Sequence, residues 1–354
     1  MLDMVKKMKG LAFFITLICG ILLVSACSNP NSNSSASGSS SASQSASESE
    51  PASPSARPSA SASEEAGKFP RAIQAANGEI TIQEEPKKVA VVHWGYGDSI
   101  LLFNLESLAL ALPFSEETSV LKTDSYKPYV DKVKELTIVG ENTQVNLESL
   151  VAYDPDLIIG GNSVNAEIAG ELEKIAPTVL IDEATTNIWG DWPAVVTKFG
   201  EILGQEEVAS DYISEFRGKV EEAKAKLADL GGNVAFMQVR EKEAWLQGTN
   251  YLQPYYEGGL NLTPPDSADI KEGAQLSLEG LAELNPDYLF LGYFNYGDKS
   301  VPAVTDEWEK SEVWKKLKAV QDGHVYGING ELALGYGPIG NSYGVQAIAD
   351  SLGQ

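Results

Sequence analysis

Arg240 is the residue whose type and position point most directly to ligand-binding chemistry. The chain has 26 basic residues against 50 acidic ones, and only four of the basic residues are arginines. The other three are Arg57, Arg71 and Arg217. Arg240 alone follows an apolar run, residues 233–239, that predicts a strand. A guanidinium group can donate two parallel hydrogen bonds to carboxylate or hydroxamate oxygens. An ion pair with Glu241 or Glu243 is the alternative role.

Aromatic and amide side chains gather in the segments that follow the predicted strands. In open parallel α/β sheets, ligands bind beyond the carboxyl ends of the strands. Aromatic walls with a few polar groups suit a flat, amphipathic ligand. We therefore predict these ligand-binding residues: Trp94, Tyr96, Asn142, Asn162, Arg240, Trp245, Tyr293, Tyr296 and Tyr336. Lys122 and Lys127 could add positive potential, although ordinary solvated lysines are the simpler interpretation.

Residues typical of catalytic and metal sites are sparse. The only histidines are His93 and His324, and both cysteines, Cys19 and Cys27, lie near the N-terminus. No cluster has the spacing of metal ligands. Gly95-Tyr96-Gly97 follows a predicted strand, but Ile100 stands where a dinucleotide-binding fingerprint has its third glycine. A surface-anchored enzyme that uses carboxylates remains the alternative from a different class.

The elements that must position these residues alternate between strands and helices. Apolar runs at 89–92, 137–139, 156–159 and 178–181 predict buried strands, with helical stretches between them, the first at residues 99–105. This alternation predicts an α/β fold of two lobes, each a mainly parallel sheet with flanking helices. Residues 206–227 lack proline and predict one long rigid helix that joins the lobes. An ordinary packing helix within one large domain is the alternative. We expect an N-terminal lobe at 67–205, an interdomain helix at 206–228 and a C-terminal lobe at 229–354.

Two similar segments support the division into two lobes. Residues 147–161 and 278–292 lie 131 positions apart and share six of fifteen residues without a gap. Each predicts a short helix, a proline break and a buried strand. Asn146 and Ser277 are suitable N-caps, which place Glu148 and Glu279 in the first helical turn, where the helix dipole favours an acid.

The first 66 residues have the features of an export signal and a tether. Lysines precede an uncharged apolar stretch at 11–24, which is typical of a signal peptide. Leu23-Val24-Ser25-Ala26-Cys27 resembles the bacterial lipobox, so we expect residues 1–26 to be removed and Cys27 to carry the lipid. A plain signal peptide with an incidental cysteine is the alternative. Residues 27–66, rich in serine, are expected to form a disordered tether.

The charge balance argues against two kinds of electrostatic partner. The formal net charge is −24 at pH 7 and the pI is about 4.4. Nucleic acids and anionic lipid surfaces attract basic proteins, so neither is an expected electrostatic partner.

From 67 to 354 the chain resembles the substrate-binding proteins of bacterial ABC importers for iron–siderophore complexes, haem and cobalamin. The resemblance rests on Pro86-Lys87-Lys88-Val89-Ala90-Val91, the duplicated segments, the long helix, and the late segment from Trp314 to Tyr326. It implies two lobes with a ligand between them, and permease docking through Glu148 and Glu279.

The resemblance also implies a monomeric, lipid-anchored protein on the extracytoplasmic face of the cell membrane, which passes its ligand to an ABC permease. Iron would be coordinated by the siderophore, so neither a cofactor nor a direct metal ligand is expected. Triply anionic catecholates call for several cations in the site, so a hydroxamate or citrate-hydroxamate is favoured. Haem or cobalamin remains the alternative, with His93 or a tyrosine such as Tyr96 as a haem ligand.

Overall fold

The computed structural model describes residues 68–353. The predictions for the signal peptide, the lipidated Cys27 and the tether fall on residues outside the described part of the chain.

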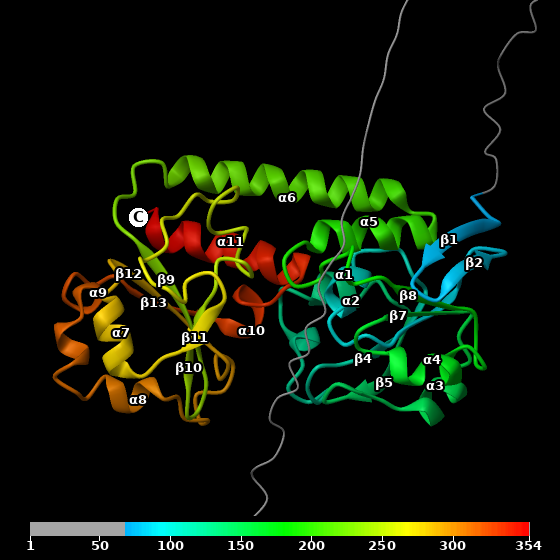
Figure 1. Ribbon diagram of the computed structural model, residues 1–354, viewed down its shortest axis with the longest axis horizontal. Coiled ribbons are helices and arrows are strands. Elements are labelled where there is room, and N and C mark those ends of the chain that lie inside the picture. The colour runs from blue at the N-terminus through cyan, green and yellow to red at the C-terminus, as the bar shows by residue number, and fades with distance from the viewer. Residues whose placement is uncertain (1–67, 354) are drawn as a thin grey trace, which may run out of the picture. The chain divides into compact units, whose positions relative to one another are not determined.

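Two separate, mainly parallel sheets form the framework (Figure 1). The first has the strand order β6-β5-β4-β3-β7-β8, in which only β6 is antiparallel to its neighbour. The second has the order β11-β10-β9-β12-β13, with β9, β12 and β13 parallel. We call the first sheet with its helices the N-terminal lobe and the second the C-terminal lobe. The predicted two-lobed α/β fold is confirmed.

The strands of the N-terminal lobe and its opening hairpin are β1 (Arg71–Ala75), β2 (Gly78–Ile82), β3 (Lys88–Val91), β4 (Ser107–Ala111), β5 (Glu135–Glu141), β6 (Gln144–Val145), β7 (Leu157–Gly161) and β8 (Thr178–Ile181). Those of the C-terminal lobe are β9 (Val234–Val239), β10 (Ala244–Gln247), β11 (Gly273–Gln275), β12 (Tyr288–Tyr293) and β13 (Val325–Asn329).

The helices are α1 (Gly97–Ile100), α2 (Lys127–Val130), α3 (Leu147–Tyr153), α4 (Ala169–Leu172), α5 (Trp192–Leu203), α6 (Glu206–Lys226), α7 (Leu278–Leu284), α8 (Thr305–Trp308), α9 (Lys318–Gln321), α10 (Gly330–Ala333) and α11 (Pro338–Leu352). No helix within residues 68–353 is both long and apolar enough to cross a membrane.

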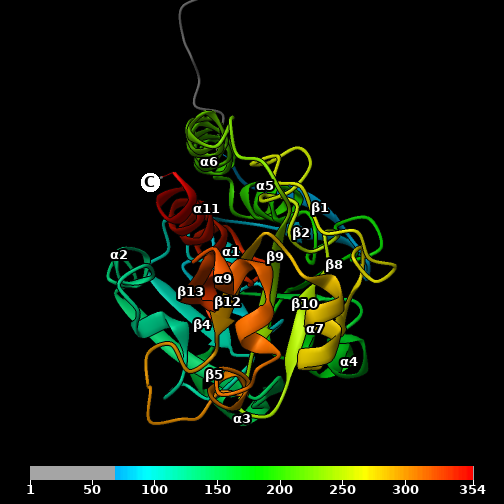
Figure 2. The same ribbon diagram turned by 90° about the vertical axis from the view of Figure 1, so that its left-hand side faces the viewer.

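Helix α6 connects the two sheets and lies along α5 and α11 (Figures 1 and 2). Its sequence favours a helix, because Glu206 and Glu207 lie in the first turn and Lys224 and Lys226 in the last, as the helix dipole prefers. A stripe at helical spacing, which includes Phe216 and Val220, is buried against its neighbours. The helix predicted at 206–227 is thus observed almost residue for residue.

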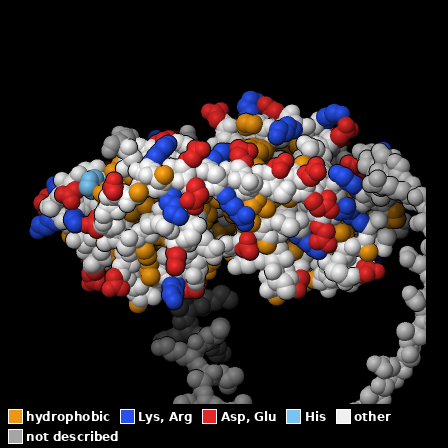
Figure 3. Space-filling view, turned by 90° about the horizontal axis from the view of Figure 1, so that it is seen from above, with side chains coloured by type: hydrophobic (Ala, Val, Ile, Leu, Met, Phe, Trp, Pro, Cys, Tyr) orange, Lys and Arg blue, Asp and Glu red, His pale blue; other side chains and the backbone are white. Residues whose placement is uncertain are grey.

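Charged side chains of both signs intermingle on the face that carries α6 (Figure 3). Pairs one helical turn apart account for part of this pattern. Lys219 lies 2.9 Å from Glu215, and Lys224 lies 3.5 Å from Glu221. This face therefore presents no patch of a single sign, despite the net charge of −24.

The hydrophobic core is continuous between the lobes. One cluster contains Val91 and Ile159 from the first sheet, Phe236 and Phe290 from the second, and Phe199 on α5. Smaller clusters cover the other faces of the two sheets. The lobes therefore share packed side chains as well as the long helix.

One local prediction was wrong, and one strand was not predicted. The helix expected from Ser99 is the single turn α1, and the apolar run that follows forms β4, a strand that the pattern did not reveal. Residues 101–112 are apolar except at three positions, and periodicity cannot separate a buried strand from a buried helix in so short a run.

Candidate functional site

A cavity of about 300 Å³ lies at the carboxyl ends of strands from both sheets. We call it the ligand cavity. The N-terminal lobe contributes the segments after β3 and β4, and the C-terminal lobe contributes the ends of β9 and β12 and the segment from α10 to α11. Parallel sheets place their binding residues at this edge. The volume is at the lower end of the range for small-molecule sites.

Aromatic rings from the two lobes meet at the edges of the ligand cavity. Phe114 and Phe294 stand edge to face, with ring centroids 6.5 Å apart. Tyr336 meets Trp189 edge to face at 4.9 Å, and Trp189 lies 5.1 Å from Trp94. Such contacts give the cavity apolar walls that are fixed by packing.

Arg240 is held in the cavity wall by its backbone and by an aromatic ring. Its N–H donates to the carbonyl of Glu243 at 3.0 Å, and its carbonyl accepts from the N–H of Val304 at 2.9 Å. The guanidinium carbon lies 4.6 Å from the ring centroid of Phe294. The buried Nε has no hydrogen-bond partner. A buried donor without a partner costs free energy, so Arg240 is ready to donate to a ligand.

The alternative role of Arg240, an ion pair with a neighbouring glutamate, is not observed. Glu241 lies near Lys242, at 3.7 Å, and Glu243 accepts a hydrogen bond from Gln275 at 3.4 Å.

Asp98 joins the two lobes beside the ligand cavity. Its carboxylate accepts hydrogen bonds from the N–H groups of Ile339 (3.0 Å) and Gly340 (3.3 Å) at the start of α11, and from the Tyr126 hydroxyl (2.8 Å). Burial raises the pKa of Asp98 to about 6, while these three hydrogen bonds act in the opposite direction.

The structure brings three of the predicted ligand-binding residues to the ligand cavity. Trp94, Arg240 and Tyr336 line it. Tyr336 is 37% exposed and Trp94 is half-buried.

Tyr96 does not line the cavity, because its side chain is fully buried. Its ring stacks on His93 at 4.1 Å and meets Phe199 edge to face at 5.5 Å. The chain turns into α1 at Gly97, and this turn directs Tyr96 into the core although Trp94, two residues earlier, faces the cavity.

The remaining predicted residues lie outside the cavity lining. Asn142 is exposed in the turn between β5 and β6. Asn162, which follows β7, donates to the Asp182 carboxylate and accepts from the Glu183 N–H, both in the segment that follows β8. Tyr293 packs on the opposite face of the second sheet, where Thr305 donates to its hydroxyl at 3.3 Å, and Tyr296 is exposed beside Lys299.

Trp245 occupies an intermediate position. It is exposed on β10 and stands opposite Gln238, which lines the cavity. Opposite residues on antiparallel strands point to the same face, so Trp245 lies on the cavity side of the sheet without entering the lining.

Several lining residues were not predicted, among them Phe114, Tyr126, Gln238, Phe294 and Glu331. Phe294 and Gln238 lie at strand ends, where the carboxyl-end rule could have found them. Glu331 lies on α10 and carries no local signal.

His93 belongs to a structural network. Its Nδ1 accepts the Gly95 N–H at 3.0 Å, so the other nitrogen, Nε2, donates to Glu183 at 3.2 Å. His93 is fully buried, as is Tyr96. Neither side chain is therefore placed to ligate a haem iron in this cavity.

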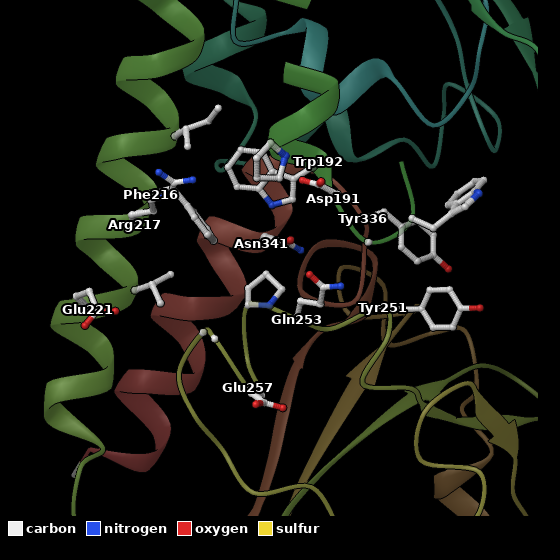
Figure 4. Close-up of a pocket in the computed structure, with 18 residues that line it drawn as sticks. Asp191, Trp192, Phe216, Arg217, Glu221, Tyr251, Gln253, Glu257, Tyr336 and Asn341 are labelled. Carbon is white, nitrogen blue, oxygen red and sulfur yellow. The ribbon is translucent and has the colours of Figure 1, made fainter. Parts of the chain in front are cut away.

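A second cavity, of about 240 Å³, lies beside α6 (Figure 4). Its walls include Arg217 and Glu221 on α6, Trp192 at the start of α5, and Glu257 in a loop of the C-terminal lobe. Tyr336 is the one described residue that lines both cavities. Helices and loops form most of this helix-side cavity, and among the segments that follow parallel strands only the far end of the one after β8 reaches it directly. The first cavity lies at the carboxyl ends of strands from both sheets, so it is the candidate ligand site.

Within residues 68–353 no group of three or more His, Cys, Asp and Glu side chains is arranged to hold a metal ion.

A ligand-sized cavity between two α/β sheets is the arrangement expected of a solute-binding protein, since small-molecule sites commonly lie at the junction of domains. The chain belongs to the periplasmic binding protein family, whose model matches residues 103–332. This is a family of substrate-binding proteins of transporters and not of enzymes, so the enzyme alternative is set aside and the resemblance is confirmed.

Relatives from Bacillus subtilis (strain 168) carry names of iron-binding proteins. The iron(3+)-hydroxamate-binding protein YxeB is 29% identical over 294 residues, which cover 80% of this chain and 85% of that protein. The Fe(3+)-citrate-binding protein YfmC is 28% identical, covering 73% and 78%. The iron-uptake system-binding protein is 26% identical over 211 residues, which cover 57% of this chain and 63% of that protein.

Solved structures share the fold. A periplasmic binding protein component of a Fep/Fec-like ferrichrome ABC transporter from Bacillus subtilis is 25% identical, with a TM-score of 0.64, and covers 80% of this chain and 100% of that one. Staphylococcus aureus SirA, solved with staphyloferrin B, has a TM-score of 0.62 at 23% identity and covers 80% and 98%.

Proposed function

We propose that this chain captures a ferric siderophore in the ligand cavity and delivers it to an ABC permease for iron uptake. The observation that carries the proposal is Arg240, whose buried Nε has no partner in an aromatic-walled cavity between two lobes. The names of the relatives, which include hydroxamate-binding and citrate-binding proteins, support iron chelates as the ligand class.

A ferric hydroxamate, or a mixed citrate-hydroxamate, suits this cavity best. Arg240 is the only cationic side chain in the described lining, and Lys122 and Lys127 are exposed outside it. A triply anionic catecholate complex would leave most of its charge without a partner in a partly desolvated site. The iron would be held by the siderophore, and the protein would need no cofactor of its own.

Delivery would involve Glu148 and Glu279, one on each lobe. Both are exposed in the first turns of α3 and α7. We further propose that Cys27 carries a lipid that anchors a monomeric protein on the extracytoplasmic face of the cell membrane. The lipobox-like segment before Cys27 and the lipoprotein names of some relatives support this anchor.

A fluorescence titration tests the ligand and the site together. Ferric hydroxamates, haem and cobalamin are added to the protein, and quenching of tryptophan emission is followed, since Trp94 lies in the cavity wall. We expect a one-to-one complex with a ferric hydroxamate. Replacing Arg240 by alanine should weaken that complex roughly 10- to 100-fold, the usual effect of losing hydrogen bonds from a charged donor.

Arg217→Ala is the matched control, because Arg217 lines only the helix-side cavity. Its affinity should equal that of the wild type. If Arg217→Ala weakens binding and Arg240→Ala does not, the ligand occupies the helix-side cavity. Tighter binding of haem or cobalamin than of any ferric hydroxamate would refute the proposed ligand class.

A further inference from the structure

The ligand cavity contains more acid than base. Its described lining has three charged side chains, which are Asp98, Arg240 and Glu331. A site built to hold an anion normally surrounds it with cationic groups or with several N–H donors. Here the single guanidinium shares the cavity with two carboxyl groups.

Asp98 is fully engaged within the protein. Its two oxygens accept three hydrogen bonds, from Tyr126, Ile339 and Gly340. Its negative charge is therefore directed toward the start of α11, and it offers little to a ligand.

Glu331 has no such engagement. Asn329 caps α10 and accepts the Glu331 N–H at 3.1 Å, which fixes the backbone of this residue. The Glu331 carboxyl group makes no hydrogen bond or ion pair with another residue in the described part of the chain, and it is half-buried. Burial raises the pKa of Glu331 to about 7, against the opposing influence of nearby Arg240.

A carboxylate in this state favours a positive charge beside it. It has lost part of its hydration and has gained no hydrogen bond in return. A cationic group on a ligand would restore that loss, whereas an anionic group would add repulsion at close range.

We propose that Glu331, which shares the ligand cavity with Arg240, selects ferric chelates that carry a positively charged arm and disfavours anionic chelates. Arg240 would donate to hydroxamate oxygens while Glu331 meets an ammonium group on the same ligand. This inference rests on the proposed function and narrows its ligand class. Of the two chelates named there, it favours a hydroxamate with a cationic arm over a citrate-hydroxamate, whose ferric complex is anionic.

Three ferric probes of different charge test the selection. Ferrioxamine B is a trihydroxamate with a free ammonium arm, ferrichrome is a neutral trihydroxamate, and ferric dicitrate is anionic. Each is titrated into the wild type and Glu331→Gln, about one pH unit above the pKa of Glu331, where the carboxyl group is mostly ionised.

The wild type should bind ferrioxamine B most tightly of the three probes. Glu331→Gln should weaken ferrioxamine B on the order of 10-fold, strengthen ferric dicitrate by a similar factor and leave ferrichrome unchanged. An unchanged ferrichrome affinity also shows that the variant cavity is intact. Glu117→Gln is the matched control. Glu117 is exposed and lies next to a segment that lines the cavity, so this substitution removes the same charge from outside the cavity.

The outcomes separate this inference from the function on which it rests. A wild type that binds none of the three chelates refutes both. If the wild type binds chelates but Glu331→Gln leaves the three affinities in the same ratio, only the charge selection is refuted. A shift of equal size in Glu117→Gln would also refute it, because the effect would then be the long-range field of the protein.

Discussion

Glu183 shows how one charged residue joins three segments at the carboxyl edge of the first sheet. One oxygen accepts from His93 Nε2 at 3.2 Å, and the other accepts the N–H and the hydroxyl of Ser163 at 2.8 and 2.6 Å. Burial by itself would raise the pKa of Glu183, but these hydrogen bonds outweigh it and lower the pKa to about 2. The carboxylate therefore stabilises the folded state through its charge.

This shift predicts a specific loss of stability in acid. A carboxyl group whose pKa is lower in the folded state stabilises the protein above its unfolded pKa and loses that contribution as the pH falls. The change from 4.5 to about 2 corresponds to roughly 3 kcal/mol, lost between about pH 4.5 and pH 2. Glu183→Gln should lack this pH dependence and be less stable near neutral pH. Denaturant unfolding at a series of pH values measures both effects.

Glu167→Gln is the matched control for acid stability. Glu167 is an exposed acid on the same lobe, so its removal should leave the pH profile of the unfolding free energy close to that of the wild type. If Glu183→Gln and Glu167→Gln give the same profile, Glu183 does not have the role described here.

At the residue scale the sequence singled out Arg240, which lines the cavity, but not Glu331, which also lines it. Arg240 stands out because arginines are rare in this chain and it follows an apolar run. Glu331 is one of 50 acidic residues, so its type does not single it out. It reaches the cavity because α10 lies against the end of β12, where Gly330 packs on Gly292. That contact depends on tertiary structure, which no local pattern records.

At the element scale the duplicated segments proved to be equivalent structures. Each forms a short helix that ends in a left-handed residue, Asp154 in one and Asn285 in the other, followed by proline and a buried strand. Asn146 and Ser277 cap the two helices as predicted, through hydrogen bonds to the N–H groups of Ser149 and Gly280. Capping and proline signals act locally, which is why the sequence could locate these helices.

The order of the strands could not be predicted in the same way. In the first sheet β3 lies between β4 and β7, an arrangement that depends on which apolar faces pack together. The missed strand β4 is central to this sheet and entirely buried, so its sequence lacks the polar alternation that marks a half-exposed strand.

The docking prediction concerns Glu148 on α3 and Glu279 on α7, the two equivalent helices. Replacing both Glu148 and Glu279 by alanine should abolish ferric siderophore uptake by cells while leaving ligand affinity at the wild-type value. The cost in stability should be small, about 0.3–1 kcal/mol for each first-turn acid. Iron uptake, fluorescence titration and thermal unfolding of the same variant measure the three quantities.

Glu207→Ala is the control for the docking prediction, because Glu207 is an exposed acid in the first turn of α6. It should transport normally. A double variant that still transports would remove Glu148 and Glu279 from docking, and one that loses ligand affinity would place them in the cavity or in the fold.

At the scale of the whole molecule, three kinds of contact join the lobes around the ligand cavity. The hydrophobic core runs from one sheet to the other, aromatic pairs such as Phe114–Phe294 cross the gap, and Asp98 bonds the start of α11. Gly337 allows the last contact, since a Cβ atom there would lie 2.1 Å from an Asp98 oxygen. Large movement of the lobes would break all three kinds of contact at once.

We therefore expect ligand binding to change the shape of the protein very little. The radius of gyration from small-angle X-ray scattering should differ by less than about 1 Å between the free protein and its complex with a ferric hydroxamate, as in preorganised complexes. Asp98→Asn replaces one acceptor oxygen by an NH2 group, which cannot accept a hydrogen bond. This variant should loosen the contact between Asp98 and the start of α11 and increase the difference in radius of gyration. Asp131→Asn changes an exposed aspartate of the N-terminal lobe and should behave as the wild type. A decrease of several ångströms in the radius of gyration of the wild type would mean that the core between the lobes rearranges on binding. The cavity would then belong to only one of two conformations of the protein.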